Sequence, residues 1–107
     1  MSLSNKSCTP CLGDTPSLSF EITKKLLLEL NNGWIIDKSS KLYKEYHFAD
    51  FVRAMDFANK VASLAEMEGH HPDLAISWGK CVVQIWTHNI NGLTENDFIL
   101  ATKIDKL

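Results

Sequence analysis

The apolar residues of the chain recur with two periods, one typical of helices and one typical of strands. Spacings of three and four predict a helix over about residues 20–31, a longer one over about 51–67, and a third that begins after Thr94. Gly69 and Pro72 follow the longest of these segments. Because glycine favours the position just past a helix and proline cannot continue one, we expect the chain to turn there.

Each predicted helix has an apolar stripe that we expect to face the core. The stripe of the first helix contains Phe20, Ile22, Leu26, Leu27 and Leu30. The stripe of the second contains Phe51, Ala54, Met55, Ala58, Val61, Ala62 and Ala65, and that of the last contains Ile99, Leu100 and Ile104. Ser19, Asp50 and Thr94 stand where N-caps are expected. Asp97 is placed to complete a capping box with Thr94.

Alternating and β-branched residues predict four strands. Two surround a polar turn, at about 34–38 and 41–48, and two lie within 73–88 around a tight turn at Gly79–Lys80. The element order is therefore α-β-β-α-β-β-α. Strand pairs joined by short turns imply an antiparallel sheet, and helices with a single apolar stripe must cover one face of it. We predict a two-layer α+β fold with a four-stranded antiparallel sheet and three helices on one face.

The last predicted strand has two distinct faces. One carries Cys81, Val83, Ile85 and Thr87, and the other carries Val82, Gln84, Trp86 and His88. The second face is more apolar than contact with water requires, so we expect it to meet a ligand or another subunit.

Length and composition fit one domain, which we place at 18–107 after a poorly ordered N-terminal arm at 1–17. The chain has 107 residues, 45% of them apolar and 22% charged. A net charge of −2 provides no broad basic field for nucleic acid or an anionic membrane. The sequence contains neither an apolar run of about 18 residues nor a signal-peptide pattern. We therefore expect a cytoplasmic protein that binds neither nucleic acid nor membrane.

The three cysteines, Cys8, Cys11 and Cys81, do not suggest a disulfide framework. Cys8 and Cys11 form a C-x-x-C pair, which can be half of a zinc site or a redox motif. No second pair with ligand spacing follows, and the surrounding leader is rich in Ser, Thr, Pro and Gly. We interpret the pair as part of the arm.

Three of the four histidines stand at predicted element ends. His70 and His71 follow the longest helix and His88 ends the last strand, so all three can meet at one rim of a compact sheet. Imidazoles exchange protons near neutral pH, and a nearby carboxylate fixes which ring nitrogen carries hydrogen. Glu66 lies four residues before His70, which is one helical turn if the helix extends so far.

Spacing alone leaves other interpretations open. Three histidines are also a catalytic zinc set, although adjacent side chains diverge and rarely bind one ion. The histidines are equally compatible with a loop at a helix C-terminus. Asp97 has its capping role as the simplest explanation. Trp78 precedes a turn and suits either a flat ligand or hairpin packing.

The motifs over residues 18–105 closely resemble the pterin-4a-carbinolamine dehydratases, nearest to their microbial members. E-x-x-x-H-H-P-D begins at Glu66 and is followed by Trp78 in an aromatic position. V-x-I-W-T-H-N-x-N-G-L-T-E-N-D-F begins at Val83. The resemblance implies a four-stranded sheet with three helices on one face. It also implies an activity, which is the removal of water from a 4a-hydroxytetrahydropterin to give quinonoid dihydropterin, with no metal or organic cofactor.

The resemblance places the catalytic histidines at His70, His71 and His88 and the supporting carboxylates at Glu66 and Asp97. Pro72 and Trp78 are expected to contact the substrate. We expect His70 and His88 to handle protons while His71 orients the pterin.

The resemblance also implies a homodimer or homotetramer and a functional link to an aromatic amino acid hydroxylase. Two alternatives remain. One is a non-catalytic dimerisation or transcriptional-coactivator module, as in animal members of the family. The other is a zinc protein that uses Cys8, Cys11 and a histidine pair.

Overall fold

The computed structural model describes residues 3–9, 16–30 and 33–107. Three α-helices are present in this part of the chain, α1 (Phe20–Leu28), α2 (Phe51–Glu68) and α3 (Glu95–Ile104). Two short 3-10 turns are η1 (Leu3–Asn5) and η2 (His88–Ile90). The strands are β1 (Ile35–Ile36), β2 (Leu42–His47), β3 (Asp73–Ser77) and β4 (Lys80–Ile85).

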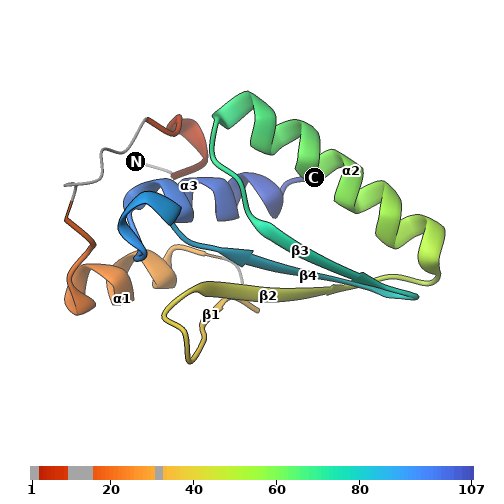
Figure 1. Cartoon of the computed structure of the whole chain (residues 1–107), viewed down its shortest axis with the longest axis horizontal. Coiled ribbons are helices and arrows are strands. Elements are labelled where there is room, and N and C mark those ends of the chain that lie inside the picture. The colour runs from red at the N-terminus through yellow and green to blue at the C-terminus, as the bar shows by residue number, and fades with distance from the viewer. Residues whose placement is uncertain (1–2, 10–15, 31–32) are drawn as a thin grey trace.

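The strands form one antiparallel sheet in the order β1-β2-β4-β3 (Figure 1). The interior strand β4 pairs with β2 along Leu42–His47 and with β3 along Asp73–Ser77. Helices α2 and α3 pack together, and α2 also packs on β3 and β4. The predicted α+β fold and its element order are confirmed.

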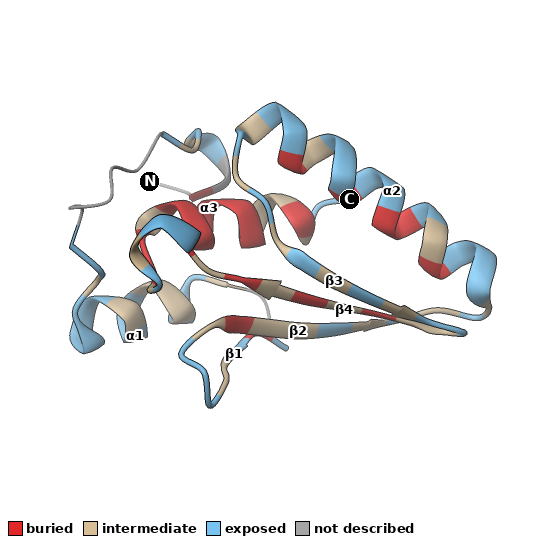
Figure 2. Cartoon of the chain, viewed as in Figure 1, coloured by how far each residue is buried: buried red, intermediate tan, exposed pale blue. Residues whose placement is uncertain are grey.

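The hydrophobic core lies between the sheet and α2 and α3 (Figure 2). Strand β4 alternates as predicted: Cys81, Val83 and Ile85 are buried, and the residues between them are partly exposed. Since successive side chains of a strand point to opposite faces, this alternation fixes which face is covered. It also sends the residues after the strand in alternate directions, with Thr87 buried and His88 exposed.

The buried stripe of α2 differs from the predicted one. Ala54, Phe57, Ala58, Val61 and Ala65 are buried. Phe51 and Ala62, which we predicted in the stripe, are exposed. The sheet contacts a narrower part of the helix than the full apolar stripe, so the flanking apolar positions remain at the surface. The predicted cap is confirmed, because the Asp50 side chain accepts from the backbone N–H of Arg53 at 2.9 Å.

Helix α1 is shorter than predicted and less buried. It ends at Leu28, because the N–H groups of Glu29 and Leu30 bond three residues back and tighten the last turn. Its Leu26 and Leu27 pack against the core, whereas Phe20 is 76% exposed. The helix packs on α3, so only one side of it is covered.

Asp105, just after α3, is a buried carboxylate with three side-chain donors. It accepts from the indole N–H of Trp34 at 2.9 Å, the Lys44 ammonium at 2.8 Å and the Tyr46 hydroxyl at 2.5 Å. Burial first, and then the Asp105 carboxylate, raise the pKa of the Tyr46 phenol, so this hydroxyl remains a donor. The network fastens the end of α3 to the sheet.

The predicted separation into an arm (1–17) and a domain (18–107) stays a prediction. Within the described part of that arm, Leu3 is 3% exposed and belongs to the core cluster. No helix among the described residues combines the length and apolar character needed to cross a membrane.

Candidate functional site

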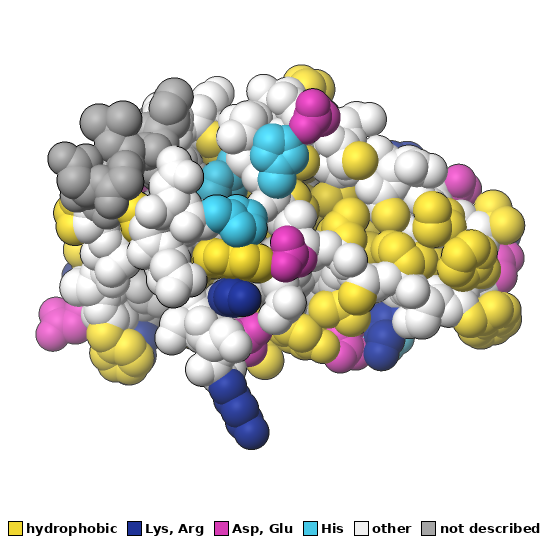
Figure 3. All heavy atoms as spheres, viewed as in Figure 1, with side chains coloured by type: hydrophobic (Ala, Val, Ile, Leu, Met, Phe, Trp, Pro, Cys, Tyr) yellow, Lys and Arg dark blue, Asp and Glu magenta, His cyan; other side chains and the backbone are white. Residues whose placement is uncertain are grey.

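A polar cavity of about 310 Å³ opens where α2 ends, where η2 begins and where α3 starts. Its lining residues are Thr9, Gly69, His70, His71, Thr87, His88, Asn89 and Asn96. The space-filling view shows histidine side chains gathered on this face (Figure 3). The structure therefore brings His70, His71 and His88 to one cavity.

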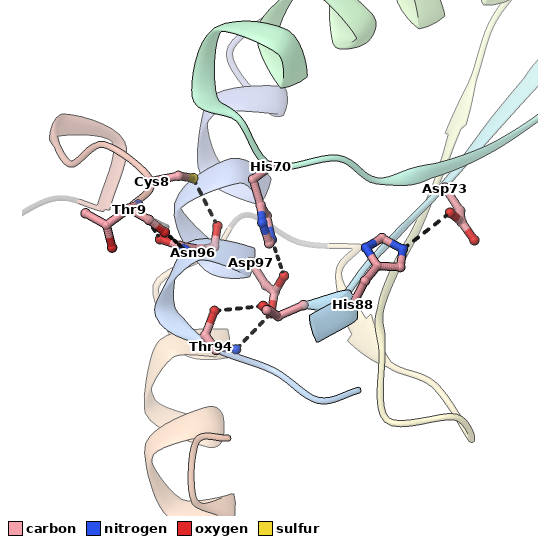
Figure 4. Close-up of polar contacts among 9 residues, drawn as sticks. Cys8, Thr9, His70, Asp73, His88, Thr94, Asn96 and Asp97 are labelled. Atoms are coloured by element: carbon pink, nitrogen blue, oxygen red, sulfur yellow. Dashed lines mark hydrogen bonds and ion pairs between the residues drawn. The ribbon is translucent and has the colours of Figure 1, made fainter. Parts of the chain in front are cut away.

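Gly69 directs the chain into this cavity. Its backbone is left-handed, with φ 65° and ψ 25°, and its N–H donates to the carbonyl of Ala65. Glycine adopts this conformation without the steric cost that a side chain would add. The helix stops at Glu68, and His70 leaves the helical path toward α3 (Figure 4).

His70 is held by Asp97 of α3. The Nε2 atom of His70 lies 2.6 Å from Oδ1 of Asp97, and the two side chains are 11% and 0% exposed (Figure 4). A buried charge is tolerated only when donors surround it. The His70–Asp97 contact is more enclosed than the pairs that His71 and His88 make with carboxylates.

The other oxygen of Asp97 is also occupied. Oδ2 accepts from the backbone N–H of Thr94 at 2.8 Å and from the hydroxyl of Thr87 at 2.9 Å. The Thr94 hydroxyl, 2.8 Å from the Thr87 oxygen, then supplies the hydrogen for that contact. The predicted bond from the backbone of Thr94 to Asp97 is confirmed, and the same carboxylate also holds a histidine.

This arrangement assigns the tautomer of His70. Oδ2 of Asp97 already accepts from two donors, and an ionised carboxylate can only accept, so Nε2 of the ring must donate to Oδ1. In the neutral ring Nδ1 is then the acceptor. With Nε2 donating to Asp97, Nδ1 is the ring atom that can accept a proton.

His71 pairs with Glu66 instead. Its Nε2 lies 2.5 Å from Oε2 of Glu66, with the side chains 56% and 78% exposed. Glu66 would be one helical turn from His70 only if the helix extended that far, and the helix ends at Glu68. Solvent weakens such an exposed pair.

His88 is the least restrained of the three. Its Nε2 lies 4.0 Å from Oδ1 of Asp73, at the start of β3. Its ring is 4.2 Å from the Trp86 ring, at an angle of 52°. The Lys41 ammonium lies 3.8 Å from the centre of the same indole. Trp86, on the open face of the sheet, thus contacts both a histidine of the cavity and a cation, and its predicted contact with a ligand or subunit stays a prediction.

Two further predicted residues lie outside the polar cavity. Pro72 lines a smaller, mainly apolar cavity of about 200 Å³ together with His71, Glu66 and Leu74. Trp78 lies in the turn between β3 and β4 and is 70% exposed. Strand β3 carries the chain away from the histidines before this turn, so the structure does not bring Trp78 to them.

Sequence reasoning missed Thr9, Thr87, Asn89 and Asn96 as lining residues. Two features of the sequence could have identified Thr87. It precedes His88 in the T-H motif, and it continues the alternate buried positions of β4. Asn96 adjoins Asp97 but has no pattern of its own. Thr9 belongs to a segment without periodicity, and only tertiary contact places it at the cavity.

The cysteine and metal alternatives gain no geometric support. In residues 3–9, 16–30 and 33–107, no group of three or more His, Cys, Asp or Glu side chains is placed to hold a metal ion. Burial, reinforced by Glu68, raises the pKa of the Cys8 thiol to about 12, so it is protonated at neutral pH. Cys11 lies outside the described residues.

The fold and the cavity define a small α+β protein with three histidines and a buried carboxylate at the rim of an antiparallel sheet. Residues 16–107 match the model of the family described as pterin 4 alpha carbinolamine dehydratase. The chain belongs to this family.

Relatives cover nearly the whole chain. A Rickettsia bellii protein named for this family is 60% identical over 106 residues, which are 99% of this chain and 94% of that one. A crystal structure from Brucella melitensis, described as a transcriptional coactivator/pterin dehydratase, is 29% identical with a TM-score of 0.78. The match covers 85% of this chain and 97% of that one.

A pterin dehydratase-like protein described as a RuBisCO assembly factor of the alpha-carboxysome is 20% identical with a TM-score of 0.60. It matches 71% of this chain and 89% of its own. At this identity the likeness concerns the fold alone.

Proposed function

We propose that the protein is a dehydratase that converts 4a-hydroxytetrahydropterin to quinonoid dihydropterin and water. The bond between C4a and the hydroxyl oxygen breaks, N5 loses its proton, and the N5 electron pair forms the new C4a–N5 double bond. No electron is gained or lost, so the reaction needs an acid and a base and no redox partner. The observation that carries the proposal is the meeting of His70, His71 and His88 at one cavity in a chain of this family.

His70 is the proposed base. Its Nδ1 accepts the N5 proton, while Asp97 holds Nε2 and stabilises the positive ring. His88 is the proposed acid at the departing hydroxyl. Its ring is half-exposed and loosely held, which suits a group that must exchange protons with water between turnovers. General acid–base help of this kind contributes about 10²–10⁴-fold to a rate.

His71 is proposed to orient the pterin, with Glu66 as its partner. It stands between the polar cavity and the apolar cavity that contains Pro72. A flat heterocycle needs both polar anchors and apolar contact, and a residue that lines both cavities can align the ring with His70.

The wider setting is also proposed. We expect no metal or organic cofactor, a cytoplasmic location, and assembly as a homodimer or homotetramer. The substrate would come from a reaction that hydroxylates the pterin at C4a, which is the basis of the expected link to an aromatic amino acid hydroxylase.

A stopped-flow dehydration assay on synthetic 4a-hydroxytetrahydropterin, with a chelator present, tests the proposal. We expect activity with the chelator, a loss of about 10²-fold or more in His70→Ala, a comparable loss in His88→Ala, and mainly a raised KM in His71→Ala. A fully active His70→Ala would contradict the assigned base. Activity that the chelator abolishes would favour the zinc alternative.

The interaction-module alternative makes a different prediction. If the chain acts only by binding another protein, the His70→Ala and His88→Ala variants restore every phenotype of a strain that lacks the gene, as the wild type does. If dehydration is the function, neither variant complements a growth defect that depends on the pterin.

A further inference from the structure

Residues 6–9, which we call the strap, lie across the end of α2 and the start of α3. The backbone N–H of Cys8 donates to Oε1 of Glu68 at 2.9 Å. The Lys6 ammonium lies 2.8 Å from Oε2 of Glu95. The strap therefore contacts the last turn of one helix and the first turn of another.

The strongest connection is reciprocal (Figure 4). The N–H of Thr9 donates to Oδ1 of Asn96 at 3.0 Å, and Nδ2 of Asn96 donates to the carbonyl of Thr9 at 2.5 Å. The Cys8 thiol also lies 3.6 Å from the backbone carbonyl of Asn96. Asn96 is 6% exposed. A buried amide that gives and receives one bond with the same backbone holds that backbone in both position and direction.

Both anchors of the strap adjoin the residues that hold the proposed base. Asn96 immediately precedes Asp97, and Glu68 stands just before Gly69 and His70. Glu68 is also tied to α3, since its Oε2 lies 2.7 Å from the Lys103 ammonium. The Cys8 N–H first, and then Lys103, keep the pKa of Glu68 below its usual range, so it remains a charged anchor.

The strap also reaches the cavity itself. Thr9 lines it together with the three histidines, and so does Asn96. The strap is therefore one wall of the space in which the proposed reaction occurs, and it is fastened to both elements that bring His70 and Asp97 together.

We propose that Asn96 is a positioning residue that acts through Thr9: it holds the strap against α2 and α3, and thereby sets the His70–Asp97 alignment and one wall of the pterin cavity. This inference rests on the proposed dehydratase function. Displacement of reacting groups by about 1 Å can cost about 10²-fold in rate. The two bonds between Thr9 and Asn96 thus have a catalytic consequence although neither residue handles a proton.

The test compares Asn96→Ala, a deletion of residues 1–9, and the combination of both, with Lys6→Ala as the matched control. Lys6→Ala removes a strap contact that is partly exposed, and neither Lys6 nor Glu95 lines the cavity. We expect Asn96→Ala to lower kcat/KM by about 10–100-fold, with KM raised as well as kcat lowered. Lys6→Ala stays within about twofold of the wild type. The deletion also removes the core residue Leu3 and the contacts of Lys6 and Cys8. The double change is no worse than the deletion alone, because the deletion has already removed the Thr9 backbone that Asn96 holds.

A second readout does not depend on activity. The ¹⁵N signals of the His70 ring report its tautomer and its bond to Asp97, and we expect them to shift in Asn96→Ala and in the deletion but not in Lys6→Ala. Kinetics are measured well below the melting temperature of each variant. If only one of the two variants, Asn96→Ala or the deletion of residues 1–9, folds, the His70 ¹⁵N signals are measured in that one.

Wild-type kcat/KM and unchanged His70 signals in folded Asn96→Ala would overturn the inference, as would additive effects in the double variant. Failure of the proposed function looks different, since the wild-type protein itself would then leave 4a-hydroxytetrahydropterin unreacted in the presence of chelator. The His70 signals would still test the alignment in that case.

Discussion

His70 and Asp97 are 27 residues apart in the chain, and 2.6 Å separates Nε2 of the imidazole from Oδ1 of the carboxylate. The same carboxylate accepts the N–H of Thr94 and so begins α3. One buried side chain thereby determines both where a helix starts and which nitrogen of a histidine carries hydrogen. The local structure of α3 and the chemistry of the cavity depend on a single group.

We predict that Asp97→Asn inactivates the protein more than its small change in shape suggests. The side-chain carbonyl will occupy the Oδ2 position, which has two donors, so the NH₂ group will face His70. Nε2 must then accept, the ring proton moves to Nδ1, and the proposed base is lost. We expect kcat to fall by about 10²–10⁴-fold.

Stopped-flow dehydration and ¹⁵N spectra of the imidazole measure the two halves of this prediction. Glu95→Gln, in the same turn of α3, serves as the control and keeps the wild-type tautomer. An Asp97→Asn protein with full activity would show that the tautomer is immaterial.

Glu66→Gln should have a far smaller effect. The Glu66–His71 pair is exposed on both sides, so its removal costs less than about 1 kcal/mol of unfolding free energy. If His71 only orients the pterin, kcat changes by less than about threefold and KM rises. Steady-state kinetics of Glu66→Gln and Asp97→Asn, measured side by side, show which variant loses more kcat. Equal losses in kcat for the two variants would refute the separate roles proposed for His70 and His71.

Asp105→Ala tests stability away from the cavity. The change leaves the Lys44 ammonium, the Trp34 N–H and the Tyr46 hydroxyl without their shared acceptor. Loss of one partner from a buried charged network costs about 3–5 kcal/mol. Urea titration should show this loss, while kcat per folded molecule remains near the wild-type value. Asp105→Asn keeps one acceptor oxygen and should lose less, and a stability equal to the wild type in Asp105→Ala would contradict the importance of the network.

Glu68 predicts an acid-sensitive contribution to stability. Its folded-state pKa is below the ordinary value of 4.5, first because of the Cys8 N–H and then because of Lys103. A lowered pKa stabilises the fold fully at pH values above the unfolded pKa, and this contribution disappears as pH falls through the folded pKa. The difference in urea midpoint between the wild type and Glu68→Gln should therefore be greatest at neutral pH and shrink below about pH 4.5. A difference that is constant with pH would show that Glu68 does not act through its charge.

Much of the fold could be predicted because its signals are local. The period of two in Lys80–Ile85 and the caps at Asp50 and Thr94 are properties of short segments, and each was found where it was expected. The prediction was wrong where burial depends on a partner. Phe51 belongs to an apolar stripe, but whether it is covered depends on how the sheet meets α2.

The pairing inside the site was less predictable. Glu66 is one helical turn from His70 in sequence, yet it contacts His71, because a glycine in the left-handed conformation ends the helix first. Asp97 could be identified as a helix cap, but its second role needed the position of α3 relative to α2. Thr9 carried no signal, since a segment without periodicity gives no indication of its contacts.

The sequence by itself determined the element order, the helix caps, the parity of the last strand and the residue types of a histidine and carboxylate site. These follow from periodicity and from hydrogen bonds between near neighbours, which the chain specifies wherever it folds. Only the tertiary structure decided that His70 pairs with Asp97, that His71 pairs with Glu66, and that Thr9 closes one side of the cavity. Those contacts depend on the packing of α2, α3 and the sheet around a shared core, and packing is a property of the whole chain.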